Sequence, residues 1–365
     1  MIILWILLGA AALVVIVVAH ELGHFAAAKL SGVRVEEFFV GFGPKIWSTK
    51  RGETEYGFKW IPAGGYVKIA GMDPNEEIEP EDLPHTYKGV SRWKRFFTIV
   101  SGSAVHIILA IIIAFMAIWL LGVPDTEDAT NIIASVGQTT ETGAPTPAAE
   151  AGLQPDDTIV ALNGSPVSDW NAVSDFIRTH PDQQITMEIR RNGQDLTLTA
   201  NLIDANGIGF LGISPTPQID RYNFVSSIGQ TGKWLGQYSW GVVYSFYRVF
   251  NLSTLEQLVG IRKPTDERPV SIVGISRLTG QVAHQGLRQL LFFIAFLLLF
   301  LGYVNLLPLP PLDGGHLMVL GVEAVSGKEI DMRKLYPVAV VVIAIFTTLF
   351  LLTLRLDITN PINIP

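Results

Sequence analysis

The chain has 365 residues, of which 49% are hydrophobic and only 16% are charged. Soluble domains usually carry about 25% charged residues, so this composition indicates a membrane protein with several spans. The net charge of -7 disfavours a nucleic-acid-binding protein, which would present a basic face. The absence of cysteine excludes disulfides, thiolate metal sites, cysteine nucleophiles and lipid anchoring through cysteine. A metal ion would therefore be bound by His, Asp or Glu.

Apolar runs long enough to cross a bilayer, which needs about 20 helical residues, occur at four places in the chain. The first run has no basic residue ahead of it and no clear small-residue cleavage site after it. We therefore expect a retained span and not a signal peptide. The predicted transmembrane helices are residues 1–30, 96–122, 288–320 and 336–356.

The segment 31–95, between the first two spans, is rich in lysine and arginine. The positive-inside rule places it in the cytoplasm, so both termini and the long segment after the second span lie outside. Glycines and a residue period of two predict strands and hairpins here. The many aromatic residues predict a sheet that touches the membrane or dips into it, where protein must shield the backbone.

The outer segment 123–218 has the alternating strands and turns of a soluble α+β domain. Asn192-Gly193 predicts a hairpin turn between two of its strands. In the following linker, 219–287, the aromatic stretch Tyr222–Asn251 predicts a helix lying in the membrane interface. A helix packed on the soluble domain is the alternative. The predicted fold is a polytopic α-helical membrane protein with four transmembrane helices, a membrane-associated β-sheet and an inserted α+β domain.

The motif His20-Glu21-Leu22-Gly23-His24 ends the first span. On a helix, the i, i+4 spacing puts both imidazoles on one face, where they can bind one Zn²⁺ ion. Glu21 lies one position along, where it can take a proton from a water molecule at the metal. Two buried structural histidines are the alternative, but three ionisable groups in a membrane helix usually serve a function.

A catalytic zinc site usually has three protein ligands and one open position. Candidates for the third ligand inside the predicted spans are His106, Asp313 and His316. If the first and third spans both run inward, His24 and Asp313 lie at similar depth, whereas His106 lies somewhat deeper. Prolines and paired glycines interrupt the third span beside Asp313, and broken backbone at depth is tolerated where it lines a cavity.

The HELGH motif, followed far downstream by NLLPLPPLDGG, resembles the site-2 protease family of zinc intramembrane proteases. The GFG and GGYVKI segments and the inserted outer domain resemble its bacterial, RseP-type branch. The resemblance covers nearly the whole chain. It implies that the zinc ligands are His20, His24 and Asp313, and that Glu21 is the catalytic base.

The same resemblance also implies how substrate is held. Asn305 and the proline-rich loop that contains Pro310 would help to hold an unwound substrate helix. The sheet in the segment 31–95 would pair with the substrate as an added strand. The sheet residues implied are Gly64, Gly65, Tyr66 and Val67.

The second span departs from the family pattern. Many relatives carry a G-P-x-x-N motif there, whereas this chain has Ser103 at the proline position and His106 at the asparagine position. A neutral His106 could hydrogen-bond a substrate backbone or approach the metal. A histidine whose hydrogen bonds are satisfied within the helix bundle is the equal alternative.

The outer domain resembles a PDZ domain, because AAEAGLQPDDTIVALNG has the helix-turn-strand passage of bacterial examples. The resemblance implies a loop whose backbone amides bind a peptide carboxyl terminus. The domain could instead act as a size filter at the entrance. The loop residues are Gly209, Phe210, Leu211, Gly212 and Ile213.

The function implied is a zinc-dependent intramembrane endopeptidase that acts in regulated proteolysis and stress response. The substrate would be a single-span protein such as an anti-sigma factor or a signal-peptide remnant, cleaved within its transmembrane segment in the bacterial inner membrane. Lipid bilayer and substrate are the expected partners, and no nucleic acid is expected. One alternative is a membrane zincin for soluble or lipidated peptides, with Glu323 as third ligand. The other is a non-catalytic membrane scaffold that acts through its PDZ domain.

Overall fold

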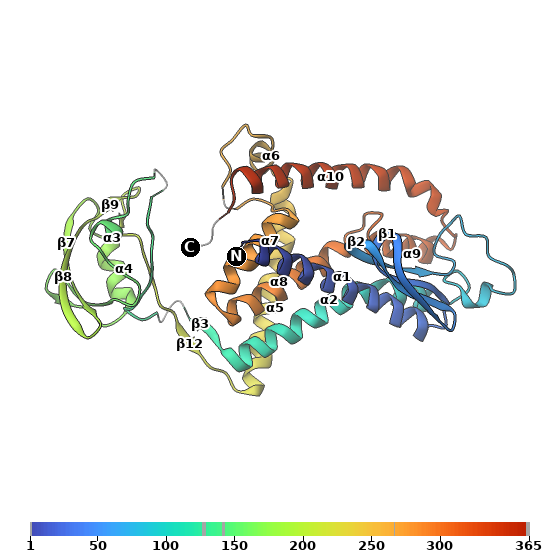
Figure 1. The fold of residues 1–365 in the computed structure, drawn as a ribbon, viewed down its shortest axis with the longest axis horizontal. Helices are drawn as coiled ribbons and strands as arrows, with labels where there is room; N and C mark the ends of the chain where they lie inside the picture. Colours follow the sequence, from blue (N-terminus) through green and yellow to red (C-terminus); the bar gives the residue numbers. More distant parts are fainter. Residues whose placement is uncertain (1, 126–128, 141–142, 266, 363–365) are drawn as a thin grey trace. The chain divides into compact units, whose positions relative to one another are not determined.

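The computed structural model describes residues 2–125, 129–140, 143–265 and 267–362. These residues form two compact units, 2–117 with 225–362 and 118–224. The first unit contains the HELGH motif, the predicted inner sheet and the C-terminal helices, and the second contains the predicted outer domain (Figure 1).

The described residues include four helices that are long and apolar enough to cross a membrane, as predicted. They are α1 (Ile2–Leu30), α2 (Arg92–Leu121), α8 (Leu287–Asn305) and α10 (Tyr336–Thr359). Helix α1 ends where Gly32 adopts a φ of +77°, a conformation that glycine reaches without strain.

The predicted third span, 288–320, needs correction. Helix α8 ends at Asn305, and a separate helix, α9 (Asp313–Ser326), begins after a loop. The loop contains three prolines, which supply no backbone N–H to continue the helix. It folds back on the start of α9, because a Cβ at Gly314 would lie 2.1 Å from Leu307 O. The paired glycines of the LDGG motif therefore permit this close packing.

The predicted linker 219–287 contains three helices and not one. Helix α5 (Phe224–Val249) covers the aromatic stretch, and α6 (Leu252–Val259) and α7 (Ile272–Gln285) follow it. Ser271 caps α7 by accepting a hydrogen bond from Gly274 N. Helix α7 packs closely on α1, since a Cβ at Gly9 would lie 2.7 Å from Ser276 Cα.

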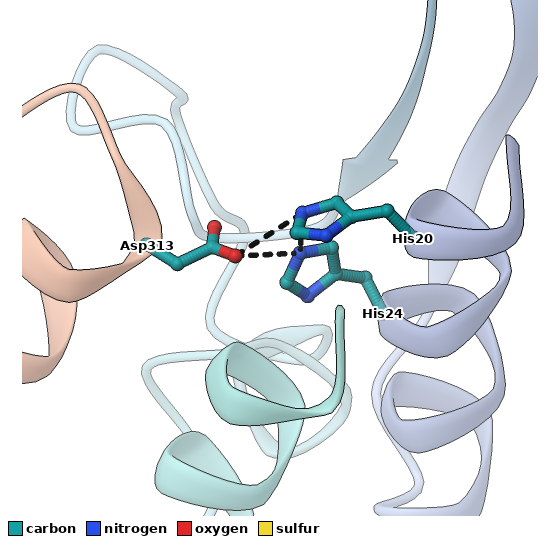
Figure 2. A group of neighbouring side chains, drawn as sticks. All are labelled: His20, His24 and Asp313. Carbon is teal, nitrogen blue, oxygen red and sulfur yellow. Dashed lines mark hydrogen bonds and ion pairs between the residues drawn. The ribbon is translucent and has the colours of Figure 1, made fainter. Parts of the chain in front are cut away.

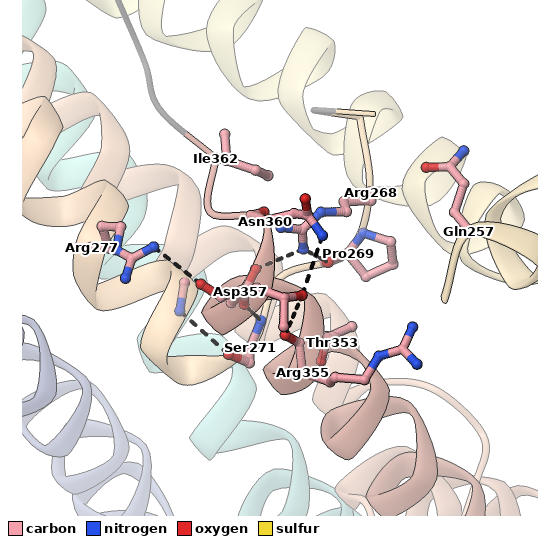
Figure 3. A network of polar contacts seen from close by, with 12 residues as sticks. Gln257, Arg268, Pro269, Ser271, Arg277, Thr353, Arg355, Asp357, Asn360 and Ile362 are labelled. Carbon is pink, nitrogen blue, oxygen red and sulfur yellow. Dashed lines mark hydrogen bonds and ion pairs between the residues drawn. The ribbon is translucent and has the colours of Figure 1, made fainter. Parts of the chain in front are cut away.

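A buried polar network attaches the end of α10 to the start of α7 (Figure 3). Arg268 Nη1 donates to Asp357 Oδ1 at 2.7 Å, and both side chains are almost fully buried. Ser271 N donates to Asp357 Oδ2 at 2.6 Å. Arg268 also donates to Asn360 O, and Arg277 donates to the backbone oxygen of Asp357. Each buried charge is therefore paired, which such groups require.

The inner sheet is built from two long, irregular strands, β1 (Val35–Arg51) and β2 (Thr54–Ile69). The first part of β1 pairs with both parts of β2, because Phe38 lies opposite Val67 and also opposite Tyr56. The last part of β1, from Lys45 onward, pairs only with the first part of β2. Residues 65–69 therefore form one edge of the sheet. The strands predicted in 31–95 are confirmed.

The second unit has its own hydrophobic core. A four-stranded sheet in the order β6-β5-β7-β8 lies beside short strand pairs and two short helices. The predicted hairpin turn is confirmed: Arg191 pairs with Gln194, and Asn192 and Gly193 both have positive φ. The elements are β3 (Val123–Asp125), β4 (Ile133–Val136), α3 (Pro147–Glu150), β5 (Thr158–Leu162), β6 (Ser165–Pro166), α4 (Trp170–Arg178), β7 (Gln184–Arg191), β8 (Gln194–Asn201), β9 (Ile203–Asp204), β10 (Gly209–Phe210), β11 (Ile213–Pro215) and β12 (Gln218–Asp220). Two 3-10 helices in the first unit, η1 (Leu83–His85) and η2 (Met332–Leu335), complete the assignment.

Candidate metal centre

The two histidines of the HELGH motif lie one turn apart on α1, and Asp313 is the first residue of α9. Figure 2 shows the Asp313 carboxylate directed at both imidazole rings. Asp313 Oδ2 lies 3.1 Å from His20 Nε2 and 3.2 Å from His24 Nε2, and the two Nε2 atoms are 3.0 Å apart. Among the residues that the structure describes, these three form the one cluster able to hold a metal ion.

The geometry of this cluster fits zinc. Zinc bonds of about 2.0–2.2 Å in a tetrahedral arrangement place neighbouring ligand atoms about 3.3 Å apart. The separations of 3.0–3.2 Å are close to that value. Asp313 Oδ2 is also buried, and apart from the two imidazole nitrogens it meets no hydrogen-bond donor among the described residues, which is costly for a carboxylate oxygen unless a cation compensates it. The fold thus brings together the three predicted ligands.

Two neighbouring groups set which nitrogen of each imidazole faces the cluster. His24 Nδ1 donates to Thr98 O at 2.8 Å, which leaves the Nε2 lone pair for a metal. Asn305 Nδ2 lies 3.5 Å from His20 Nδ1. An exchange of the amide oxygen and nitrogen would let Asn305 Oδ1 accept the Nδ1 proton and free His20 Nε2 in the same way. Sequence reasoning missed Thr98, because its backbone oxygen carries no signal in the sequence.

Gly102 on α2 provides the space that both histidines occupy. A Cβ at this position would lie 2.4 Å from His24 Nε2 and 2.7 Å from His20 Cε1. Helices α1 and α2 also approach closely at Gly23, where a Cβ would lie 2.6 Å from Ser101 O. Gly102 belongs to the family motif noted in the sequence, but its role depends on this contact between two helices.

Glu21 lies between the metal cluster and β2. A Cβ at Gly65 would lie 3.7 Å from Glu21 Cγ, and the backbone of Val67 lies near the Glu21 carboxylate. The predicted base and two of the predicted substrate-binding residues, Gly65 and Val67, are thus neighbours. Gly64 lies in the same stretch of β2, with a φ of +142° that glycine tolerates.

A groove follows the edge of β2 (residues 65–69) toward the proline-rich loop. This cavity of about 520 Å³ is lined on one side by Tyr66 and Lys68 and on the other by Pro310, Pro311 and the start of α10. Tyr66 donates to Glu37 and accepts from Lys59 at 2.7 Å. Burial and the adjacent Glu37 carboxylate raise the pKa of Tyr66, so its phenol stays neutral.

The other polar candidates lie outside the metal cluster. His106 packs its ring 4.9 Å from that of His20, and its Nε2 donates to Ile16 O at 3.0 Å. His316 lines the groove. Glu323 accepts a hydrogen bond from Ile330 N and so holds the loop after α9. Glu323, the alternative third ligand, is thus outside the metal cluster found among the described residues and bonds the loop after α9.

The predicted peptide-binding loop of the outer domain belongs to the second unit. A Cβ at Gly209 would lie 2.0 Å from Ile177 O, so this glycine permits β10 to pack on the end of α4. Gly212 has a φ of +90°, and Leu211 O accepts from Ala148 N. Phe210 is partly exposed, and Ile213 pairs with Val136. These contacts explain the glycines by packing, and peptide binding stays a prediction.

Two histidines and a carboxylate around one metal position, with a glutamate beside them on the same helix, define a metallopeptidase site. Residues 8–350 match the model of Peptidase family M50, and the chain belongs to this family. It is a zinc metalloendopeptidase of the site-2 protease type, which confirms the predicted enzyme class and cofactor.

Named relatives are similar in sequence to this chain over most of its length. Zinc metalloprotease Rip1 of Mycolicibacterium smegmatis is 32% identical, and the alignment covers 98% of each chain. Regulator of sigma-W protease RasP of Bacillus subtilis is 29% identical over 86% of this chain and 89% of its own. Among solved structures, the PDZ domain of the SdrC-like protein of Listeria monocytogenes matches 26% of this chain and 93% of its own, with 20% identity and a TM-score of 0.20.

Proposed function

We propose that this protein is an intramembrane endopeptidase that cleaves single-span proteins within their transmembrane segments. One observation carries the proposal: the histidines of the metal cluster lie inside a helix that is long and apolar enough to cross a membrane. A peptide bond that reaches this cluster therefore has to enter from the bilayer or from a cavity within it.

His20, His24 and Asp313 would hold the zinc ion, which activates water and polarises the scissile carbonyl when it is bound. Glu21 takes the proton of the attacking water and delivers it to the leaving amine. Thr98 and Asn305 keep the two imidazoles in the orientation that ligation needs.

Substrate has to be unwound before cleavage, because the carbonyls of a transmembrane helix are hydrogen-bonded within it. The free edge of β2 supplies backbone groups that replace those bonds when an extended segment pairs with it. The groove between this edge and Pro310 has room for such a segment. Glu21, which lies next to Gly65 of this edge, would then lie beside the bound backbone.

The natural substrate class is an anti-sigma factor or a signal-peptide remnant, in the bacterial inner membrane. The name of the relative RasP, a regulator of sigma-W protease, supports the first of these. The outer domain would bind a peptide carboxyl terminus or restrict the size of what enters. Mass spectrometry of membrane peptides that accumulate in a Glu21→Gln strain would identify the substrate.

Glu21→Gln provides the direct test. We expect purified enzyme in detergent to lose at least about 100-fold of its cleavage rate on a single-span substrate, because a proton acceptor is removed. Zinc content measured by atomic absorption should stay at the wild-type level. Glu188→Gln, at an exposed position of β7, is the matched control and should retain full activity. Unchanged cleavage by Glu21→Gln would refute the proposed mechanism.

A further inference from the structure

Helix α2 carries two buried polar atoms that have no partner among the described residues. They are Ser103 Oγ and His106 Nδ1, and the two residues are 0% and 2% exposed. An unpaired buried polar group costs about 1–3 kcal/mol, and native proteins usually satisfy such groups with protein or water. Because the residues are three positions apart on a helix, their side chains are neighbours.

The hydrogen bond on the other side of the His106 ring sets its tautomer. Nε2 lies 3.0 Å from Ile16 O, and a carbonyl oxygen can only accept, so Nε2 carries the proton. In the neutral ring Nδ1 then presents a lone pair. The Ser103 hydroxyl can donate or accept. A small molecule that donates to His106 Nδ1 and also bonds Ser103 Oγ would satisfy both atoms, and water meets this requirement.

The residues that carry these two atoms adjoin the metal centre. The His106 ring centroid is 4.9 Å from that of His20, and Gly102, next to Ser103, borders both histidine ligands. His106 is outside the cluster of atoms that could share one metal ion. The separation of the His106 ring nitrogens from these ligand atoms therefore suits contact through water and not direct ligation. The burial of the site also disfavours direct contact with a substrate backbone.

We propose that Ser103 Oγ and His106 Nδ1 bind a water molecule beside His20, and that this water supplies the hydrolytic site. The water donates one hydrogen bond to His106 Nδ1 and shares the other with Ser103 Oγ. This inference rests on the proposed intramembrane hydrolysis. Ser103 and His106 are the residues at the two positions where this chain departs from the G-P-x-x-N pattern.

Two isosteric replacements of His106 separate its two nitrogen atoms. Asparagine places a polar group near the position of Nδ1, whereas glutamine reaches the position of Nε2 and its bond to Ile16 O. We expect His106→Asn to keep kcat within about threefold of wild type, and His106→Gln to lose about tenfold, since one hydrogen bond to water is removed. KM and zinc content should stay unchanged in both.

Three results would overturn the proposal. An active His106→Gln with an inactive His106→Asn would show that only the bond to Ile16 matters. Loss of zinc would indicate a structural role. Weaker binding of an uncleaved single-span substrate, measured in the Glu21→Gln background, would indicate direct substrate contact. Failure of the proposed function itself would appear differently, as cleavage that survives Glu21→Gln.

Ser103→Ala adds a readout that does not depend on activity. If a water bridges the two residues, removing the hydroxyl should lower the melting temperature and reduce kcat severalfold. If no water is bound, removing an unpaired buried hydroxyl should leave stability unchanged or raise it, which contradicts the proposal. Ser245→Ala is the control, because Ser245 Oγ donates to Gly241 O within its own helix.

Discussion

His20 and His24 illustrate how individual residues prepare the metal centre. Both present Nε2 to the cluster, and each has its Nδ1 directed at a group outside the motif. These groups are Thr98 O on α2 and the Asn305 amide at the end of α8. Hydrogen-bond partners of this kind fix the orientation of the ring and its basicity as a ligand. Their loss typically weakens metal binding by roughly 10–100-fold.

Gly102→Ala should abolish or strongly weaken zinc binding, by at least about tenfold, because the new methyl group would overlap both imidazoles. Zinc titration of the purified apo-protein measures this effect, and cleavage should fall in parallel. The matched control is Gly321→Ala on α9, where a Cβ meets nothing within 4 Å. Full zinc affinity in Gly102→Ala would show that α2 does not approach the ligands as closely as described.

At the scale of elements, a strand and a loop form the groove in which we propose that substrate binds. Strand β2 contributes an edge at residues 65–69, and the loop between α8 and α9 faces it across the groove. The prolines end α8, and Gly314 and Gly315 let the loop fold against the first turn of α9. Asp313 is positioned by the same turn. The breaks in this part of the chain thus position Asp313 and form one side of the groove proposed for the substrate.

The edge of β2 can be tested by cross-linking, because the chain contains no cysteine. In the Glu21→Gln background, Lys68→Cys should form a disulfide with a single cysteine placed near the cleavage site of a substrate. Lys50→Cys, on the opposite edge of the sheet, should cross-link severalfold less. Gel electrophoresis without reductant measures the yield. Equal yields, or a higher yield at Lys50→Cys, would contradict strand addition at this edge.

The Asp357 network should stabilise the attachment of α10 to α7. Asp357→Asn leaves Arg268 buried without its charge partner, which we expect to cost about 3 kcal/mol in unfolding free energy. Chemical denaturation of the purified protein measures the change. Asp195→Asn breaks an exposed ion pair with Arg190 and should leave the unfolding free energy nearly unchanged. Similar losses in the two variants would show that burial of the Asp357 pair is unimportant.

At the scale of the whole molecule, the membrane orientation proposed from the distribution of lysine and arginine predicts which positions a membrane-impermeant maleimide labels. In intact cells, Asp195→Cys in the outer domain should be labelled, whereas Lys50→Cys in the inner sheet should react only after permeabilisation. Both positions are exposed, so access and not burial decides the result. Labelling of Lys50→Cys alone in intact cells would reverse the orientation.

Several features of this protein follow from the sequence by itself. The spacing in HELGH places two imidazoles on one face of a helix, because the α-helical repeat is local. Four apolar runs predict four candidate spans, and Asn192-Gly193 predicts its hairpin. Each of these depends on residues near one another in the chain, so composition and periodicity are sufficient.

Only the tertiary structure decides the rest. It shows that Asp313 meets both histidines, that α8 stops at Asn305, and that Gly102 borders the ligands. His24 and Thr98 are 74 residues apart in the chain, and no local pattern predicts their hydrogen bond. Periodicity tells which face of a helix is apolar or reactive. Which helix packs against that face depends on contacts between distant segments, and these become visible only in the fold.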